Sequence, residues 1–293
     1  MIRTPLSALL LGAFAALPAR ATDGLRLEGS LSAGLSSEVE DAGIGRLDAT
    51  LRLPLGRHAA LPALELGLFS FYREASNPHE TYVALNWGDT LRLGVVRPAY
   101  DAVLPSVFAG ILPATEDALF ESAGSFATDA ALRHTSVPLG LSITQTTGEL
   151  DWSLSLHDDA RGDFRAVSAA VSHEARGWRI EGAVERVWHP QDASPEGTSA
   201  KLGLHRDMGA AEAGIALLHP GAEHGRDALE LDFSYRAGAR TTLSALAHVE
   251  RSGGTDRYGL VTEHALGASD TLAVGATAGT GEAGLHAGLT HRF

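Results

Sequence analysis

The sequence predicts an all-β protein, a transmembrane antiparallel β-barrel of about sixteen strands, and three observations lead to this class. Apolar residues occupy every second position through most of the chain, in runs of about ten residues. The alternate positions carry polar and fully charged side chains. Beyond the N-terminal region the sequence has no apolar stretch long enough for a helix that spans a membrane.

The first segment, residues 1–21, has the three parts of a secretory signal. Arg3 gives a positive start, residues 6–17 form a short apolar core, and Ala19 and Ala21 form a small-x-small cleavage site. The alternative is a buried N-terminal helix, although the apolar run ends at Pro18. We therefore expect a signal peptide over 1–21 and a barrel over 22–293.

The body of the chain alternates from its first residues. Leu25, Leu27 and Leu31 share one parity, while Arg26 and Glu28 lie on the other. Such alternation predicts strands with one apolar and one polar face. The runs lie at 25–35, 47–55, 64–68, 83–87, 91–95, 150–156, 178–184, 200–204, 211–217, 229–235, 243–249, 258–260, 272–276 and 285–293.

A soluble sandwich also produces alternation, and two features favour the barrel. The runs approach the roughly nine to eleven residues that cross a bilayer at a tilt, whereas soluble strands average about five or six. The polar parity carries charges such as Glu65, Glu181 and Asp232, which a dry core does not accept unpaired. A water-filled lumen accepts them.

The segment 130–147 does not follow a single parity, because Leu132 and Leu139 fall on opposite parities across Pro138. We interpret it as one long strand with a bulge. If it is instead two strands, two other runs must merge, since single-chain bacterial barrels have an even strand number.

The longest segment without alternation is 97–129. Pro98, Pro105 and Pro113 exclude a continuing strand pair. A loop of this length in a compact domain is usually functional, and this one is rather apolar. It is either an external lid or disordered loop, or a segment that folds into the barrel and narrows the lumen.

Three parts of the chain together resemble the Gram-negative general porins, especially those of alphaproteobacteria. They are the export signal with a strand directly after it, the loop opening LRLGVVRPAYD, and the closing strand GLHAGLTHRF with its terminal Phe293. The resemblance implies a homotrimer of barrels in the outer membrane, among its lipid and lipopolysaccharide. It also implies an inward third loop and a terminal aromatic residue that the barrel assembly machinery reads.

The resemblance further implies a pore constriction in which loop acids face a row of wall arginines. The loop supplies Asp101, Glu116, Asp117 and Glu121, and the early strands supply Arg26, Arg46, Arg52 and Arg92. Each could instead be a solvated residue of a polar face. Charged side chains at a narrow passage set ion selectivity, and 36 carboxylates against 23 Lys and Arg favour a mild cation preference.

Aromatic residues fall near run ends often enough to predict interfacial girdles, with core packing as the alternative. They are Trp87, Trp152, Trp178, Trp188, Tyr258 and Phe293.

Other functions have weaker support in the sequence. A net charge of −13 argues against nucleic acid as a partner. The G-x-G-x-x-G match at 279–284 precedes a strand, so no helix N-terminus can hold a phosphate. A calcium site at Asp158, Asp159 and Asp163, beside His157, is a weak candidate against a solvated loop.

We expect no cofactor and no catalysis, but passive diffusion of small hydrophilic solutes and ions. The alternatives are a barrel enzyme of lipase or protease type and a plugged structural or adhesive barrel.

Overall fold

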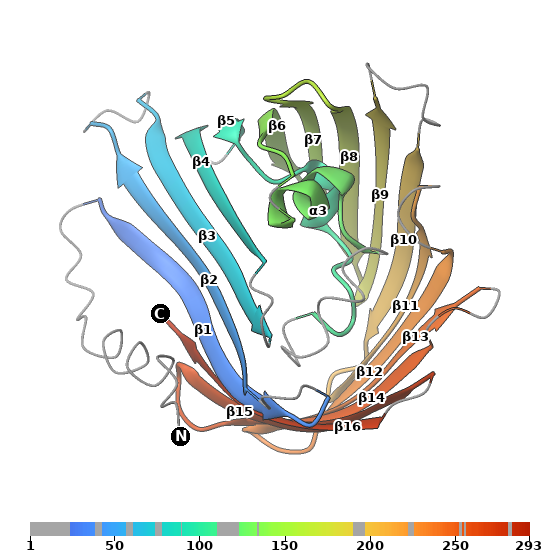
Figure 1. The fold of residues 1–293 in the computed structure, drawn as a ribbon. Helices are drawn as coiled ribbons and strands as arrows, with labels where there is room; N and C mark the ends of the chain where they lie inside the picture. The colour runs from blue at the N-terminus through green and yellow to red at the C-terminus, as the bar shows by residue number, and fades with distance from the viewer. Residues whose placement is uncertain are drawn as a thin grey trace, which may run out of the picture.

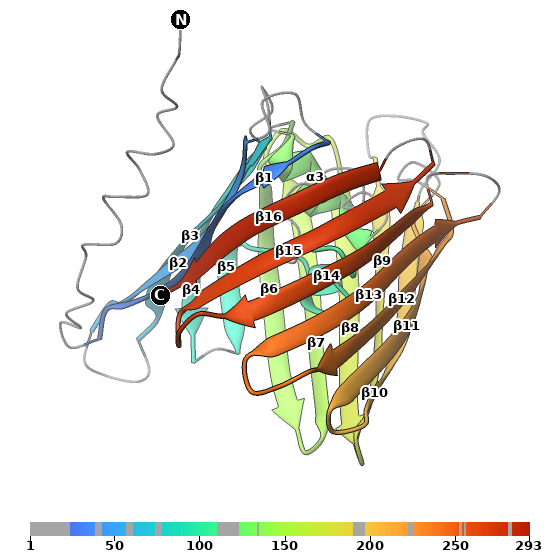
Figure 2. The same cartoon turned by 90° about the horizontal axis from the view of Figure 1, so that it is seen from below.

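Sixteen antiparallel strands close into one barrel, in which each strand pairs with its neighbours in the chain and β1 pairs with β16 (Figures 1 and 2). The computed structural model describes residues 24–38, 43–56, 61–73, 78–88, 90–109, 123–133, 135–189, 197–221, 226–251, 254, 256–280 and 283–293. The predicted fold class and strand number are confirmed.

The strands have the following bounds: β1 Arg26–Ser36, β2 Gly43–Pro54, β3 Ala63–Arg73, β4 His79–Trp87, β5 Leu91–Val95, β6 Pro138–Thr147, β7 Leu150–Asp159, β8 Arg165–Ala175, β9 Trp178–Trp188, β10 Thr198–Asp207, β11 Ala211–His219, β12 Ala228–Arg236, β13 Thr241–Glu250, β14 Arg257–Ala265, β15 Asp270–Gly279 and β16 Ala283–Arg292. The described part of the connection between β5 and β6 contains two short helices, η1 (Ala99–Ala102) and α3 (Phe126–Leu132).

The alternation along each strand separates an outer apolar face from an inner polar one. In β10, Leu202 is 58% exposed on the outside, while its neighbour Lys201 is 4% exposed and faces inward. None of the helices in the described ranges is long and apolar enough to cross a membrane.

Short turns and longer connections lie at opposite ends of the barrel. The turn between β8 and β9 consists of Arg176 and Gly177, both with positive φ (53° and 74°), as a two-residue turn between twisted strands requires. Connections after odd-numbered strands, such as 189–197 between β9 and β10, are mostly longer. We call the two ends of the barrel the turn end and the loop end.

The outward aromatic residues predicted as girdles lie at both ends. Trp87, Trp152, Trp178 and Phe293 lie toward the turn end, and Trp188 and Tyr258 toward the loop end. This placement is typical of residues at the two interfaces of a bilayer.

The sequence interpretation of 130–147 was wrong at its start. Residues 126–132 form α3, whose N-cap Ser125 accepts a hydrogen bond from Ala127 N, and the strand begins only at Pro138. The parity change across Pro138 marked the end of the loop, not a bulge. The segment between β5 and β6 therefore extends over 96–137, which we call the inward loop.

The described residues of the inward loop, 96–109, 123–133 and 135–137, lie within the ring of strands, where Figure 1 shows α3. The strand before it, β5, has only five residues, and its ladders with β4 and β6 have five residue pairs each.

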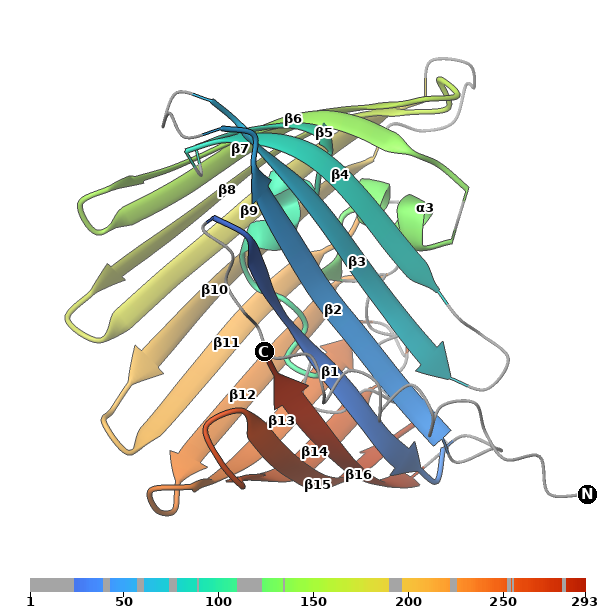
Figure 3. The same cartoon turned by 90° about the vertical axis from the view of Figure 1, so that its left-hand side faces the viewer.

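The barrel closes where both ends of the described chain meet. Gly29 and Phe293 exchange two backbone hydrogen bonds, at 3.0 and 3.1 Å, which places the C-terminus beside β1 (Figure 3). At the loop end of the same seam, Glu38 reaches past β16 to hydrogen-bond Thr277 of β15 and to pair with Arg257 of β14. Its Oε1 also lies 3.5 Å from His286 Nε2.

Candidate functional site: the constriction inside the barrel

The inward loop is fixed to the wall from its first residues. The Val96 carbonyl accepts a hydrogen bond from His157 Nε2 at 2.9 Å, and Ala99 N donates to Ser155 Oγ at 2.8 Å. These contacts turn the chain across the inner faces of β7 and β8. They satisfy backbone groups that have no strand partner after β5 ends.

Lys201, the only lysine of the chain, holds two separate parts of the inward loop. Its Nζ donates to the carbonyl oxygens of Leu104, at 3.2 Å, and Ala123, at 2.9 Å. The same ammonium lies 4.3 Å from the centre of the Tyr100 ring. A flexible point charge with three donors can serve all three contacts, which lie in different directions.

Two buried carboxylates on the wall accept hydrogen bonds from the inward loop. Glu185 of β9 accepts from Ser125 Oγ at 2.6 Å and from Phe126 N at 2.8 Å. Glu230 of β12 accepts from Ser106 Oγ at 2.8 Å and from Val107 N at 3.1 Å. Charge-assisted hydrogen bonds of this kind are stronger than neutral ones.

Apolar contacts complete the attachment. Phe108 is fully buried against Leu246 and Val261, and its ring passes over Gly259, where a Cβ would lie 2.8 Å from a ring carbon. These contacts fasten the loop to the wall from β7 to β14, and Leu132 of α3 adds an apolar contact with Phe69 and Phe71 of β3.

On the side of the barrel formed by β2 and β3, two arginine side chains lie against one aromatic ring. The guanidinium of Arg46 (β2) and that of Arg97 (the first turn of the loop) lie 5.1 and 5.5 Å from the centre of the Phe69 ring. Arg97 Nε pairs with Glu80 Oε2 at 3.0 Å, and Arg46 Nη2 lies 3.6 Å from Asp48 Oδ2. Burial lowers the pKa of Arg97, but Glu80, Tyr82, Asp48 and Asp101 together outweigh it and keep that pKa above its usual value.

A cavity of about 140 Å³ lies between this wall and the inward loop. Its lining includes Arg46 and Phe69 of the wall and Arg97, Asp101 and Thr128 of the loop. Cationic and anionic side chains therefore face one cavity in the interior of the barrel, as a charged constriction requires.

The other predicted arginines form a separate group nearer the turn end. Glu65, 4% exposed, receives a hydrogen bond from Arg52 Nη2 at 3.0 Å and one from Asn86 Nδ2 at 3.0 Å. Arg92 Nε lies 3.8 Å from its other oxygen. Arg26 is exposed at the start of β1, in register with Arg52. Arg46 and Asp101 line the same cavity, whereas Arg26, Arg52 and Arg92 are not among its lining residues.

Among the predicted loop acids, Asp101 lies within the described residues. Its carboxylate accepts hydrogen bonds from Ser125 N at 2.8 Å and Thr128 Oγ1 at 2.5 Å, so it also joins the two described parts of the loop. Glu116, Asp117 and Glu121 lie outside the described residues.

Sequence reasoning missed several residues of this site: Phe69, Arg97, Glu185, Lys201 and Glu230. Lys201 carried a signal, since it is the single lysine and lies on the polar parity of its run. Arg97 stood at the first residue of the predicted loop. Their contacts depend on the path of the loop, which alternation does not encode.

Two of the three weak calcium candidates, Asp158 and Asp159, make side-chain contacts with other parts of the protein. Asp159 accepts hydrogen bonds from Ser136 Oγ at 2.5 Å and from backbone amides that include Val137 N at 3.1 Å. Asp158 lies 3.4 Å from Arg165. In the described part of the chain, no group of three His, Cys, Asp or Glu side chains is arranged to hold a metal ion.

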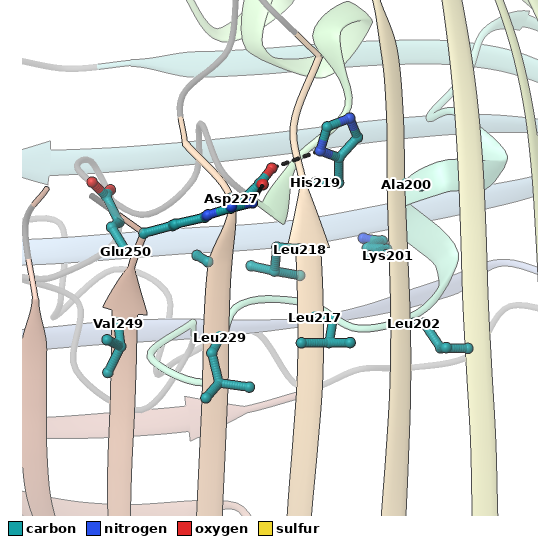
Figure 4. A pocket seen from close by; sticks show the side chains of 12 residues that line it. Ala200, Lys201, Leu202, Leu217, Leu218, His219, Asp227, Leu229, Val249 and Glu250 are labelled. Atoms are coloured by element: carbon teal, nitrogen blue, oxygen red, sulfur yellow. Dashed lines mark hydrogen bonds and ion pairs between the residues drawn. The ribbon is translucent and has the colours of Figure 1, made fainter. Parts of the chain in front are cut away.

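A second cavity, of about 570 Å³, is a groove on the outside of β10–β13 near the loop end (Figure 4). Leu202, Leu217, Leu229 and Val249 line it, and a hydrogen bond of 2.6 Å between His219 Nδ1 and Asp227 Oδ1 lies at its rim. It opens outward and does not belong to the passage through the barrel.

A closed sixteen-stranded antiparallel barrel with its long fifth connection folded inward is a porin-type barrel. The chain has this fold in common with solved structures of Rhodopseudomonas blastica porin variants. A triple mutant of that porin aligns at a TM-score of 0.68 and 15% identity, over 92% of this chain and 100% of the other.

A second variant, with five substitutions, aligns at 0.68 and 16% identity over the same shares of the two chains. A further structure, described as "Asymmetric conductivity of engineered proteins", aligns at 0.66 and 16% identity, again over 92% and 100%. No family model and no curated protein matches the sequence.

Proposed function

We propose that the protein forms a water-filled channel in the outer membrane of a Gram-negative bacterium, through which small hydrophilic solutes and ions diffuse passively. One observation carries the proposal: a closed barrel holds a loop against its inner wall, and charges of both signs line a cavity beside that loop. The R. blastica porins, which have the same fold, support it.

The selectivity of the channel follows from the balance of its charges. Carboxylates outnumber Lys and Arg by 36 to 23 in the whole chain, which favours a mild cation preference. Arg46 and Arg97 oppose it locally, because they lie on the cavity at the level of the loop. We therefore propose a weak preference for cations.

The surroundings proposed for the channel follow from its outer face. Leucine and valine side chains are exposed around the barrel, and lipid covers them. The outer groove on β10–β13 suits acyl chains of the membrane or of lipopolysaccharide. Residues 1–21 act as the signal peptide, Phe293 is read by the assembly machinery, and the working form is a homotrimer.

Planar-bilayer recording tests the proposal. The purified mature protein is added to a membrane of neutral lipid, and the current and the reversal potential in a KCl gradient are measured. We expect stable conductance steps and a reversal potential that shows weak cation preference. A membrane that stays silent while the protein is folded and inserted would contradict the channel and favour a plugged or enzymatic barrel.

A further inference from the structure

The Phe69 ring is the point at which three parts of the constriction meet. It lies on β3, faces the lumen and is 7% exposed. Phe71 and Leu132 of α3 pack in the same buried cluster. The guanidiniums of Arg46 and Arg97 approach the same ring, at 5.1 and 5.5 Å from its centre.

These two arginines reach the ring from different segments. Arg46 belongs to β2, where it pairs in register with Phe71, and Arg97 belongs to the first turn of the inward loop. Each also has an acidic neighbour, Asp48 for Arg46 and Glu80 for Arg97. An ion pair fixes the distance of a guanidinium from its partner, and an aromatic face fixes the plane of the guanidinium as well.

From this arrangement we infer that Phe69 is a positioning residue that sets the ion selectivity of the channel, by holding Arg46 and Arg97 at the cavity beside the loop. The inference rests on the proposed channel function. Phe69 makes no charged contact with a passing ion. It acts through the two arginines, whose charge opposes the proposed cation preference of the channel.

The test replaces the Phe69 ring by an apolar side chain that is not aromatic. In Phe69→Leu, an apolar side chain remains beside Leu132 and Arg46 loses the Phe69 ring, while Arg97 keeps only the Tyr82 ring, whose centre lies 5.4 Å from its guanidinium. We expect the cation-to-anion permeability ratio to rise roughly twofold, because the arginine charge is no longer held at the cavity. Phe69→Tyr restores the aromatic face and is expected to keep the wild-type ratio.

Phe164→Leu is the matched control. Phe164 also packs the loop against the wall, with its ring 4.9 Å from that of Phe126 in α3, but it belongs to an apolar cluster. If Phe69→Leu acted only by loosening α3, both variants would change the ratio equally, and the inference would be overturned. It would also be overturned if Phe69→Tyr behaved like Phe69→Leu.

A second variant keeps the test decisive if Phe69→Leu fails to fold. Replacing both Arg46 and Arg97 by lysine retains the two charges and the ring, but removes the planar groups that stack on it. We expect the same rise in the permeability ratio, and an unchanged ratio would refute the role of Phe69. A wild-type protein that does not conduct would refute the channel itself, so the two failures are distinguishable.

Discussion

Buried charged side chains hold the inward loop. Lys201 gives the clearest test among them, because it is the only lysine of the chain. Its ammonium is bound to two loop carbonyls and lies near Glu185 and Glu230, which hold the same loop. Removal of the ammonium leaves those carbonyls without their donor. Leaving a buried polar group unsatisfied costs about 1–3 kcal/mol.

We therefore predict that Lys201→Met weakens the attachment of the loop without opening the barrel. Single-channel recordings are expected to show more frequent transitions between current levels, while the strand content measured by circular dichroism stays the same. Arg206→Met on the same strand is the control, since Arg206 stacks on Trp178 at 4.7 Å and hydrogen-bonds the turn residue Arg176. Equal current noise in both variants would contradict the role of Lys201.

For single residues, the sequence predicted correctly which arginines face the lumen. It did not predict which side chains contact one another there. Arg46, Arg52 and Arg92 lie on the inner face as their parity requires. The registers of β2–β5 then place Arg52 and Arg92 around Glu65 and leave Arg46 near the cavity. Odd or even position along a strand determines which face of the barrel a side chain lies on. Its height along the barrel axis depends on the stagger between neighbouring strands, which alternation does not encode.

The elements of the seam illustrate how a loop residue can support barrel closure. Glu38 follows β1, yet its carboxylate bonds to side chains of β14 and β15 and lies near His286 of β16. Burial acts to raise the pKa of Glu38, but hydrogen bonds from His286 and Thr277 and the charge of Arg257 lower it to about 2. The ionised form is thus favoured by the folded barrel.

A depressed pKa contributes stability that is present above the ordinary value of 4.5 and is lost as the pH falls toward about 2. We predict that Glu38→Gln lowers the free energy of unfolding by roughly 1–3 kcal/mol at pH 7, and that the difference disappears near pH 2. Urea titrations of the barrel in lipid vesicles at both pH values measure it. Glu28→Gln, an exposed change on β1, serves as the control. A difference that persisted unchanged at pH 2 would contradict this explanation.

Elements were predicted well where the chain alternates and poorly where it does not. The strand runs were found because one side chain in two must face lipid or water. Helix α3 was missed because seven residues give too little periodicity, and its position depends on Leu132 packing against Phe69 and Phe71. Its start was nevertheless marked by Ser125, a residue type that caps helices.

The whole molecule is expected to behave as a closed barrel during extraction. Each of the sixteen strands is paired on both sides, so no edge is available from which unfolding can begin at low cost. We predict that the unheated protein in dodecyl sulfate migrates differently from the boiled protein, and as a band of three subunits if the proposed trimer holds. Identical migration before and after boiling would contradict a resistant barrel.

The short strand β5 has a consequence for the membrane around the barrel. Five residues rise roughly 16 Å, whereas the apolar band of an outer-membrane barrel is about 25 Å tall. Here the bilayer must become thinner, or another protein surface must shield the wall from hydrocarbon. In the proposed homotrimer, a second copy seated over β5 would remove this mismatch.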